Sequence, residues 1–190
     1  MNHQFDKQDA LIVVDVQNDF CGGGALEVPD GDAVVPVLNE WIRDASAAGI
    51  PVVASRDWHP ENHCSFEAQG GTWPPHCIRD TDGAAFHPDL ELPKDALIVS
   101  KGQSVDRDNY SAFDETGLAR ELHDRGVERV WVGGLAQDVC VQATVLDARE
   151  AGFDTHLIAD ATRAVDLNPG DGERALEAMR AAGAQIESAA

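Results

Sequence analysis

The chain has 190 residues, an apolar fraction of 43% and a formal net charge of −20. This length predicts one domain, residues 1–190, with a substantial core. The negative charge argues against binding to a nucleic-acid backbone or an anionic membrane surface, so a small molecule is the expected ligand. Whether the chain is a monomer or a homo-oligomer is left open.

The sequence contains no segment typical of export or membrane insertion. Residues 1–10 are polar, and no apolar run approaches the roughly 20 residues that span a bilayer. We therefore expect a cytoplasmic protein. Its cysteines are then expected to be reduced thiols; they are Cys21, Cys64, Cys77 and Cys140.

Short apolar runs alternate with longer amphipathic segments. The runs are apolar throughout, which is typical of parallel strands buried on both faces. They lie at 10–16, 51–55, 96–100, 129–134 and 154–160, with a last one near 184–188. Helical patterns lie near 34–48, 115–125, 138–151 and 171–182. This alternation predicts an open parallel α/β sheet with helices on both faces.

One connection, residues 57–93, breaks the alternation. It is rich in histidine, proline, tryptophan and glycine and shows little periodicity. Loops of this length in compact domains are usually functional or disordered, and the aromatic content argues against disorder. Ligands of open parallel sheets bind beyond the carboxyl ends of the strands. Polar residues just after the strands are therefore the candidates for a site.

Three strand ends supply a carboxylate, an ammonium group and a thiol. Asp15 follows the apolar residues of the first strand, where desolvation would raise its pKa and suit it to accept a proton. Lys101 directly follows the third strand, and Cys140 lies near the first turn of the helix after the fourth. A helix N-terminus and a nearby ammonium group are expected to lower the pKa of Cys140 well below about 8.5.

Each of these residues also has an ordinary explanation. Asp15 can cap a turn, Lys101 can be solvated, and Cys140 can be a small buried apolar residue. Together, however, they predict acyl transfer by an activated thiol. Gly133 and Gly134 allow a close backbone approach, and N–H groups of the following turn are candidates for holding an oxyanion.

The long loop contains a candidate metal site. Asp57 and His59 are two residues apart at a strand end, so both side chains point to the same side of an extended backbone. His63 and His76 follow, and either one completes a mixed oxygen and nitrogen set suited to zinc, iron or manganese. A polar loop with surface histidines is the alternative.

Two aromatic residues accompany these groups along the chain. Phe20 comes shortly after Asp15, and Trp73 comes shortly before His76. Aromatic side chains usually pack in a core or against a loop. Beside a nucleophile and a metal, they would also be suited to clamp a flat ring.

Five stretches of the sequence carry a resemblance to a known family. They are VVDVQNDFCGGGALEV, SRDWHPENHCSF, TWPPHCIRDTDGAAFHPDL, SKGQSVDRDNYSAF and GGLAQDVCVQATVLDA. In order and spacing they resemble the nicotinamidase branch of the isochorismatase-like hydrolase family, over residues 10–166. The resemblance implies a three-layer α/β/α sandwich with a six-stranded parallel sheet.

The resemblance also implies a function and its residues. The family members are metal-dependent cysteine amidohydrolases that convert nicotinamide to nicotinic acid and ammonia through a thioester, a step in the salvage of NAD. Asp15, Lys101 and Cys140 match the catalytic triad. The metal ligands match Asp57, His59 and His76, with His63 at or near the metal in some members. One divalent metal is implied, zinc being expected ahead of iron or manganese.

Further positions match the substrate pocket of the family. Phe20 and Trp73 fall where the pyridine ring is stacked. Ala136 and Cys140 match the residues whose amides form the oxyanion hole, with a cis peptide bond between Leu135 and Ala136. Gln137 stands where threonine is common, which puts a hydroxyl hydrogen bond near the nucleophile in doubt.

Three alternatives stay open from the sequence. A related amidohydrolase acting on a carbamoyl or ureido substrate would keep the triad but does not need the metal loop. An isochorismatase breaks an enol ether and needs no thiol. A non-catalytic relative would not need the triad intact. The sequence does not determine which metal is bound or whether analogues such as pyrazinamide are accepted.

Overall fold

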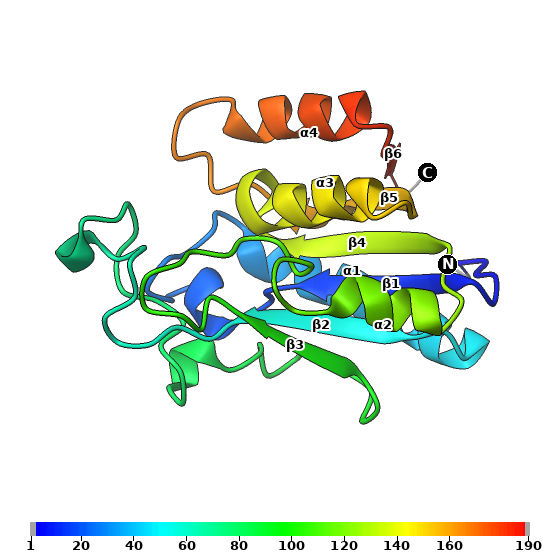
Figure 1. Ribbon diagram of the computed structural model, residues 1–190, viewed down its shortest axis with the longest axis horizontal. Helices are drawn as coiled ribbons and strands as arrows, with labels where there is room; N and C mark the ends of the chain where they lie inside the picture. Colours follow the sequence, from blue (N-terminus) through cyan, green and yellow to red (C-terminus); the bar gives the residue numbers. More distant parts are fainter. Residues whose placement is uncertain (1–2, 189–190) are drawn as a thin grey trace.

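The computed structural model describes residues 3–188, in which six strands form one parallel sheet (Figure 1). The strands are β1 (Asp9–Val14), β2 (Val52–Asp57), β3 (Leu97–Lys101), β4 (Arg129–Leu135), β5 (Asp154–Arg163) and β6 (Gln185–Glu187). Their order across the sheet is β3-β2-β1-β4-β5-β6, and every neighbouring pair is parallel. The expected six-stranded parallel sheet is confirmed.

Helices cover both faces of this sheet (Figure 1). They are α1 (Val34–Ala48), α2 (Leu118–Asp124), α3 (Gln142–Glu150) and α4 (Asp171–Ala181). Because side chains alternate along a strand, Leu11 and Val13 of β1 join the core under α1, whereas Ala10 and Ile12 join the core under the other helices. Within residues 3–188, no helix combines the length and apolar character needed to cross a bilayer.

The element boundaries differ from the expected ones at three places that matter for function. β1 ends at Val14, so Asp15 lies just beyond it with a positive φ of 48°. β3 extends through Lys101, which is the last residue of the strand rather than the first after it. The helix expected over 138–151 begins with a π-helical turn, Gln137–Val141, and α3 starts only at Gln142. Cys140 therefore lies in the π-helical turn.

The buried side chain of Gln17 connects the end of β1 to the long loop. Its amide oxygen accepts a hydrogen bond from the Asp57 N–H at 2.8 Å, and its Nε2 donates to the Asp57 carbonyl at 2.8 Å. The same Nε2 donates to the carbonyl of Ala84 at 2.9 Å. The start of the 57–93 connection and its later part are thereby fixed against β1.

Gly134 allows β4 to approach β1 at the end of the sheet that carries the candidate residues. It pairs with Val14, has a φ of 129°, and a Cβ built there would lie 2.0 Å from the Val14 carbonyl oxygen. We expect Gly134→Ala to lower the free energy of unfolding by about 3 kcal/mol or more, measured by urea denaturation, because backbone has to move.

The matched control is Gly126→Ala. Gly126 also has a positive φ, 75°, but no heavy atom lies within 4 Å of the added Cβ. Only the left-handed backbone penalty of about 1–2 kcal/mol should remain. Equal losses in the two variants would show that the contact with Val14 is unimportant.

Candidate active site

Four neighbouring strands bring charged groups and a thiol to one point. The Nζ of Lys101, at the end of β3, lies 2.6 Å from Asp57 Oδ1 and 2.7 Å from Asp15 Oδ2. It also lies 3.4 Å from the Sγ of Cys140, after β4. All four side chains are buried. Because β3, β2, β1 and β4 are adjacent in the sheet, residues far apart in sequence meet at its carboxyl edge.

Asp15 is held between β1 and β2. Its N–H donates to the Ser55 carbonyl at 3.1 Å, and the Ser55 hydroxyl donates to Asp15 Oδ1 at 2.7 Å. Burial raises the pKa of Asp15; Lys101 opposes this shift, and Asp57 adds to it. The raised pKa expected for Asp15 is confirmed, and it suits the carboxylate to take up a proton.

The expectation of a lowered pKa for Cys140 is wrong. Burial is the largest cause and raises the pKa of this thiol well above its ordinary value. Lys101 lowers it, but the carboxylates of Asp15 and Asp57 and a hydrogen bond to Asp15 raise it further. The prediction considered the ammonium group and a helix end but not two buried carboxylates beside the sulfur. The resting thiol therefore keeps its proton and needs a base.

The π-helical turn that carries Cys140 is fixed to the chain after β5. Both carboxylate oxygens of Asp138 accept backbone N–H groups, from Val165 at 2.9 Å and from Asp166 at 2.8 Å. The side chain of Gln137 donates to the carbonyl of Gly172 in α4 at 2.9 Å. Threonine is common at this position in the family. Here the Gln137 side chain makes a hydrogen bond to another helix instead of a hydroxyl hydrogen bond near the nucleophile. The Leu135–Ala136 bond before the turn is cis, as the resemblance implied.

A second group of donor atoms lies on the other side of Asp57. Its Oδ2 is 3.5 Å from His59 Nε2 and 3.9 Å from His76 Nε2. Asp57, His59 and His76 each offer one donor atom, and these three atoms lie within 4.8 Å of one another. The Nδ1 atoms of the two rings make 2.8 Å hydrogen bonds to the carbonyls of Gly102 and Pro74.

These bonds decide which ring nitrogens are available to a ligand. A carbonyl only accepts, so each Nδ1 carries a proton, and in the neutral ring each Nε2 presents its lone pair toward the Asp57 carboxylate. Burial lowers the pKa of His76; at His59 burial acts in the same direction, but Asp57 outweighs it and raises that pKa. Lone pairs facing a carboxylate fit a cation among them, and the carbonyl-bonded Nδ1 is typical of metal-ligating histidines.

His63 lies beside this group without belonging to it. Its Nδ1 is 2.7 Å from the Ser65 hydroxyl, and its Nε2 is 3.0 Å from the Arg107 carbonyl. The His63 ring stacks on His59 with 4.0 Å between centroids. Both nitrogens are therefore already engaged, and the geometry favours His76 over His63 as the third donor.

The thiol opens on a small apolar pocket. Its wall includes both expected aromatic residues and parts of both groups described above: Phe20, Trp73, His76, Asp57, Ala136 and Cys140. Tyr110 also contributes, and its hydroxyl accepts a hydrogen bond from the Trp73 indole at 3.2 Å. Tyr110 was missed from the sequence, although it lies in the SKGQSVDRDNYSAF stretch that follows β3.

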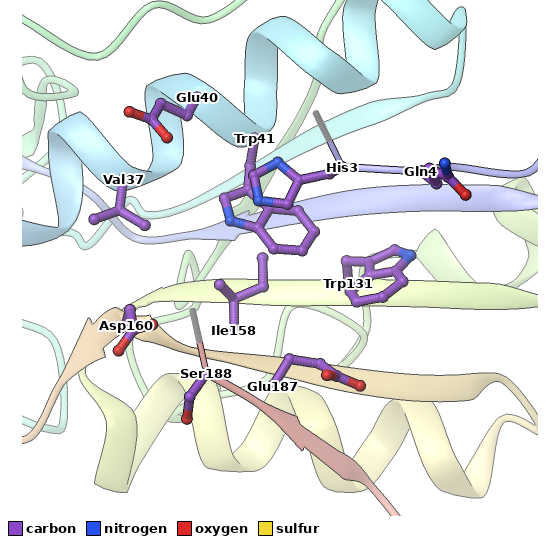
Figure 2. A pocket seen from close by; sticks show the side chains of 10 residues that line it. All are labelled: His3, Gln4, Val37, Glu40, Trp41, Trp131, Ile158, Asp160, Glu187 and Ser188. Carbon is purple, nitrogen blue, oxygen red and sulfur yellow. The ribbon is translucent and has the colours of Figure 1, made fainter. Parts of the chain in front are cut away.

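A larger hollow of roughly 280 Å³ lies on the α1 face of the sheet (Figure 2). Its aromatic walls are Trp41 of α1 and Trp131 of β4, with Ile158 of β5 beside them. None of the residues that line it belongs to the thiol or histidine groups. Size alone therefore does not identify the candidate active site, since the small pocket contains the reactive groups.

Comparison with known proteins gives consistent matches over nearly the whole chain. Residues 9–190 match the family model described as the Isochorismatase domain. The nicotinamidase of Escherichia coli is 40% identical, over 93% of each chain. The pyrazinamidase of Pyrococcus horikoshii in complex with zinc superposes with a TM-score of 0.91 and 48% identity, covering 96% of this chain and 99% of that one. PnC1 from L. infantum in complex with nicotinate superposes with a TM-score of 0.87 and 39% identity, covering 96% of this chain and 93% of that one.

Lys101 balances two buried carboxylates, and its removal should have a cost that depends on pH. We expect Lys101→Met, in chelator-treated protein, to lower the free energy of unfolding by about 3–5 kcal/mol at pH 7. Burial opposes ionisation of Asp57, but Lys101 outweighs it and holds this pKa below its ordinary value. That contribution is fully present above the unfolded pKa of about 3.9 and is lost only in more acidic solution, as the pH falls through the folded pKa.

At pH 4 the parent still has this contribution, but the difference between the variant and the parent should shrink between pH 7 and pH 4 because the variant changes. Without the ammonium group, the pKa values of Asp15 and Asp57 should rise, so that protonation relieves the penalty in the variant. Urea denaturation at both pH values measures this. Lys94→Met, at an exposed lysine, is the control and should change stability by less than about 0.5 kcal/mol. A loss independent of pH would contradict the electrostatic explanation.

Proposed function

The chain belongs to the isochorismatase family, and we propose that it hydrolyses nicotinamide to nicotinic acid and ammonia. The observation that carries this proposal is one pocket that is lined by Cys140, Asp57 and His76 together with the aromatic side chains of Phe20, Trp73 and Tyr110. A thiol with a neighbouring base suits amide hydrolysis, and a flat apolar slot suits a pyridine ring. This reaction would return nicotinamide to NAD synthesis.

In the proposed reaction, Asp15 and Cys140 exchange one proton. Burial raises the pKa of both groups. The raised pKa of Asp15 makes its carboxylate a better acceptor for the proton of the sulfur. The Nζ of Lys101 lies 3.4 Å from Sγ and stabilises the thiolate that results. The thiolate attacks the amide carbon, and the N–H groups of Ala136 and Cys140 hold the oxyanion.

The rest of the cycle uses the same carboxyl group. Asp15 returns the proton to the departing nitrogen, the C–N bond breaks, and ammonia leaves a thioester on Cys140. Water then attacks the thioester while Asp15 takes up its proton. The C–S bond breaks, nicotinic acid is released, and the proton from Asp15 restores the thiol.

Asp57, His59 and His76 would hold one divalent transition metal, with zinc proposed first because of the mixed nitrogen and oxygen donors. Such an ion would supply Lewis-acid binding of a pyridine nitrogen, which fixes the ring in the pocket. Phe20 and Trp73 would clamp the ring from its faces. A carbamoyl or ureido substrate offers no aromatic ring for this clamp, so the aromatic wall and the histidines favour nicotinamide.

The thiol mechanism makes Cys140 indispensable. Cys140→Ala should reduce ammonia release from nicotinamide by at least about 10³-fold, since no other nucleophile is proposed. The same assay with an N-carbamoyl amino acid, run in parallel with the parent protein, should give little ammonia. Cys64→Ser, at a thiol outside the pocket, is the matched control and should keep parental activity. Activity that survives in Cys140→Ala would rule out the thioester route.

Metal binding tests the second group of residues separately. After saturation with zinc and dialysis, His59→Ala and His76→Ala should each contain about one equivalent less metal per chain than the parent, by elemental analysis. His63→Ala should retain that equivalent, because its ring nitrogens are engaged elsewhere. His123→Ala is the control on α2. Loss of metal in His63→Ala would place this residue among the ligands.

A further inference from the structure

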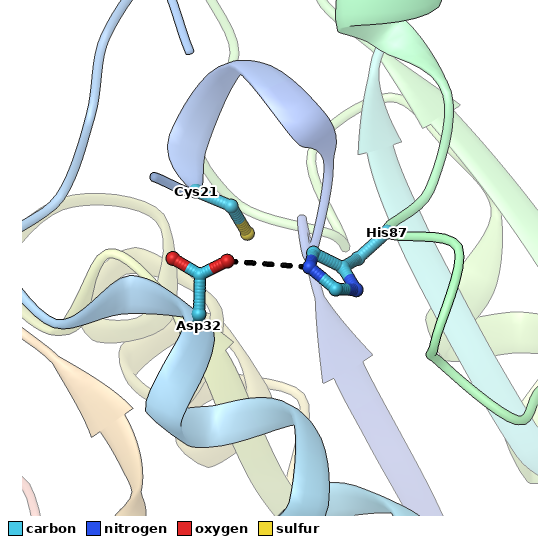
Figure 3. Close-up of side chains that lie close together, drawn as sticks. All are labelled: Cys21, Asp32 and His87. Carbon is cyan, nitrogen blue, oxygen red and sulfur yellow. Dashed lines mark hydrogen bonds and ion pairs between the residues drawn. The ribbon is translucent and has the colours of Figure 1, made fainter. Parts of the chain in front are cut away.

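A cysteine, an aspartate and a histidine, residue types that bind metals, come together outside the candidate active site. Cys21 follows the 3₁₀ turn Asn18–Phe20, Asp32 lies in the 3₁₀ turn Gly31–Ala33, and His87 belongs to the long loop. One donor atom from each, a sulfur, a carboxylate oxygen and an imidazole nitrogen, lies within 4.8 Å of the other two. Figure 3 shows the three side chains pointing toward one another.

Neighbouring backbone groups fix two of these side chains. The N–H of Gly22 donates to Asp32 Oδ2 at 2.7 Å, which leaves Oδ1 directed at His87 Nε2, 3.3 Å away. The His87 ring accepts the Asp89 N–H on Nδ1 at 3.2 Å, and the His87 N–H donates to the Val16 carbonyl at 2.9 Å. The Asp32 carboxylate is thus held in place before any ligand binds, which reduces the ordering that a ligand would require.

The three side chains differ in their exposure to solvent. Cys21 is 2% exposed, whereas the Asp32 side chain is 53% exposed and that of His87 is 14% exposed. An open hollow of roughly 320 Å³ adjoins all three residues. A small cation can therefore enter past Asp32 and reach a sulfur that is shielded from bulk solvent.

We propose that Cys21, Asp32 and His87 form a second binding site for a thiophilic divalent cation such as zinc or cadmium. Sulfur, imidazole nitrogen and carboxylate oxygen are the donors that zinc uses, and three protein ligands leave one position of a tetrahedron for water. The hydrogen bond between His87 Nε2 and Asp32 Oδ1 alone accounts for the positions of two of the three side chains. It does not account for a thiol directed at both.

Binding changes the protons of the group in a defined way. The thiol loses its proton to solvent when sulfur becomes a ligand. The His87 proton, now on Nε2 because Nδ1 accepts the Asp89 N–H, moves to Nδ1 and frees Nε2. The contact from Asp89 is given up in exchange for the metal bond. Affinity should therefore increase with pH.

Cadmium is the probe, because a cadmium–thiolate bond produces a charge-transfer absorption in the ultraviolet. Protein first saturated with zinc at the Asp57 site and dialysed is titrated with Cd²⁺. One equivalent per chain should produce the band, and added zinc should remove it by competition. Cys21→Ser should abolish the band, and His87→Gln should weaken cadmium binding by about 10-fold or more.

Three controls separate this site from the candidate active site. Cys64→Ser and Cys140→Ala should keep the band, which excludes the other thiols as its source. His59→Ala should keep it as well, even if it loses metal at the Asp57 site. The readout is independent of nicotinamide hydrolysis, so it can succeed or fail regardless of the proposed reaction. A band that persists in Cys21→Ser, or no band in the parent protein, would overturn the proposal.

Discussion

The arrangement of the candidate site depends on the contacts of the Lys101 ammonium group. It lies between the carboxylates of Asp15 and Asp57, within 2.7 Å of each, and touches the sulfur of Cys140. Two carboxylates buried this deeply would repel each other without it. In return, they raise the pKa of Lys101 well above its ordinary value against the effect of burial. The charge is therefore permanent, and its position is set by the register in which Asp57 pairs with Lys101.

The fold was accessible from the sequence because parallel strands buried on both faces are apolar along their whole length. The strand ends are visible as polar residues at or near the end of each apolar run, and this pattern makes Asp15 and Lys101 candidates for a site. The alternation of strands and helices predicted helices on both faces of the sheet, and the resemblance implied the same three-layer sandwich. The predicted boundaries were less accurate where the chain departs from regular α-helix, as in the π-helical turn Gln137–Val141 before α3.

Contacts between residues that are far apart in the chain could not be predicted from the sequence, because they form only on folding. The two N–H groups that fix Asp138 come from residues 27 and 28 positions away. The choice between His63 and His76 depends on which ring nitrogens are already hydrogen-bonded, and spacing says nothing about that. The pKa of Cys140 depends first on the burial of the thiol and then on the charges around it, and neither the burial nor the second carboxylate is visible in the motif.

Asp57 joins the two halves of the site through its two oxygens. Oδ1 faces Lys101 at 2.6 Å, and Oδ2 faces the Nε2 atoms of His59 and His76. A change at Asp57 therefore alters the charge balance around the thiol together with the histidine group. His59 and His76 contact Asp57 only through Oδ2, so their removal leaves the Lys101 ion pair in place. The histidines can thus separate metal binding from thiol chemistry, whereas Asp57 cannot, because one carboxylate serves both.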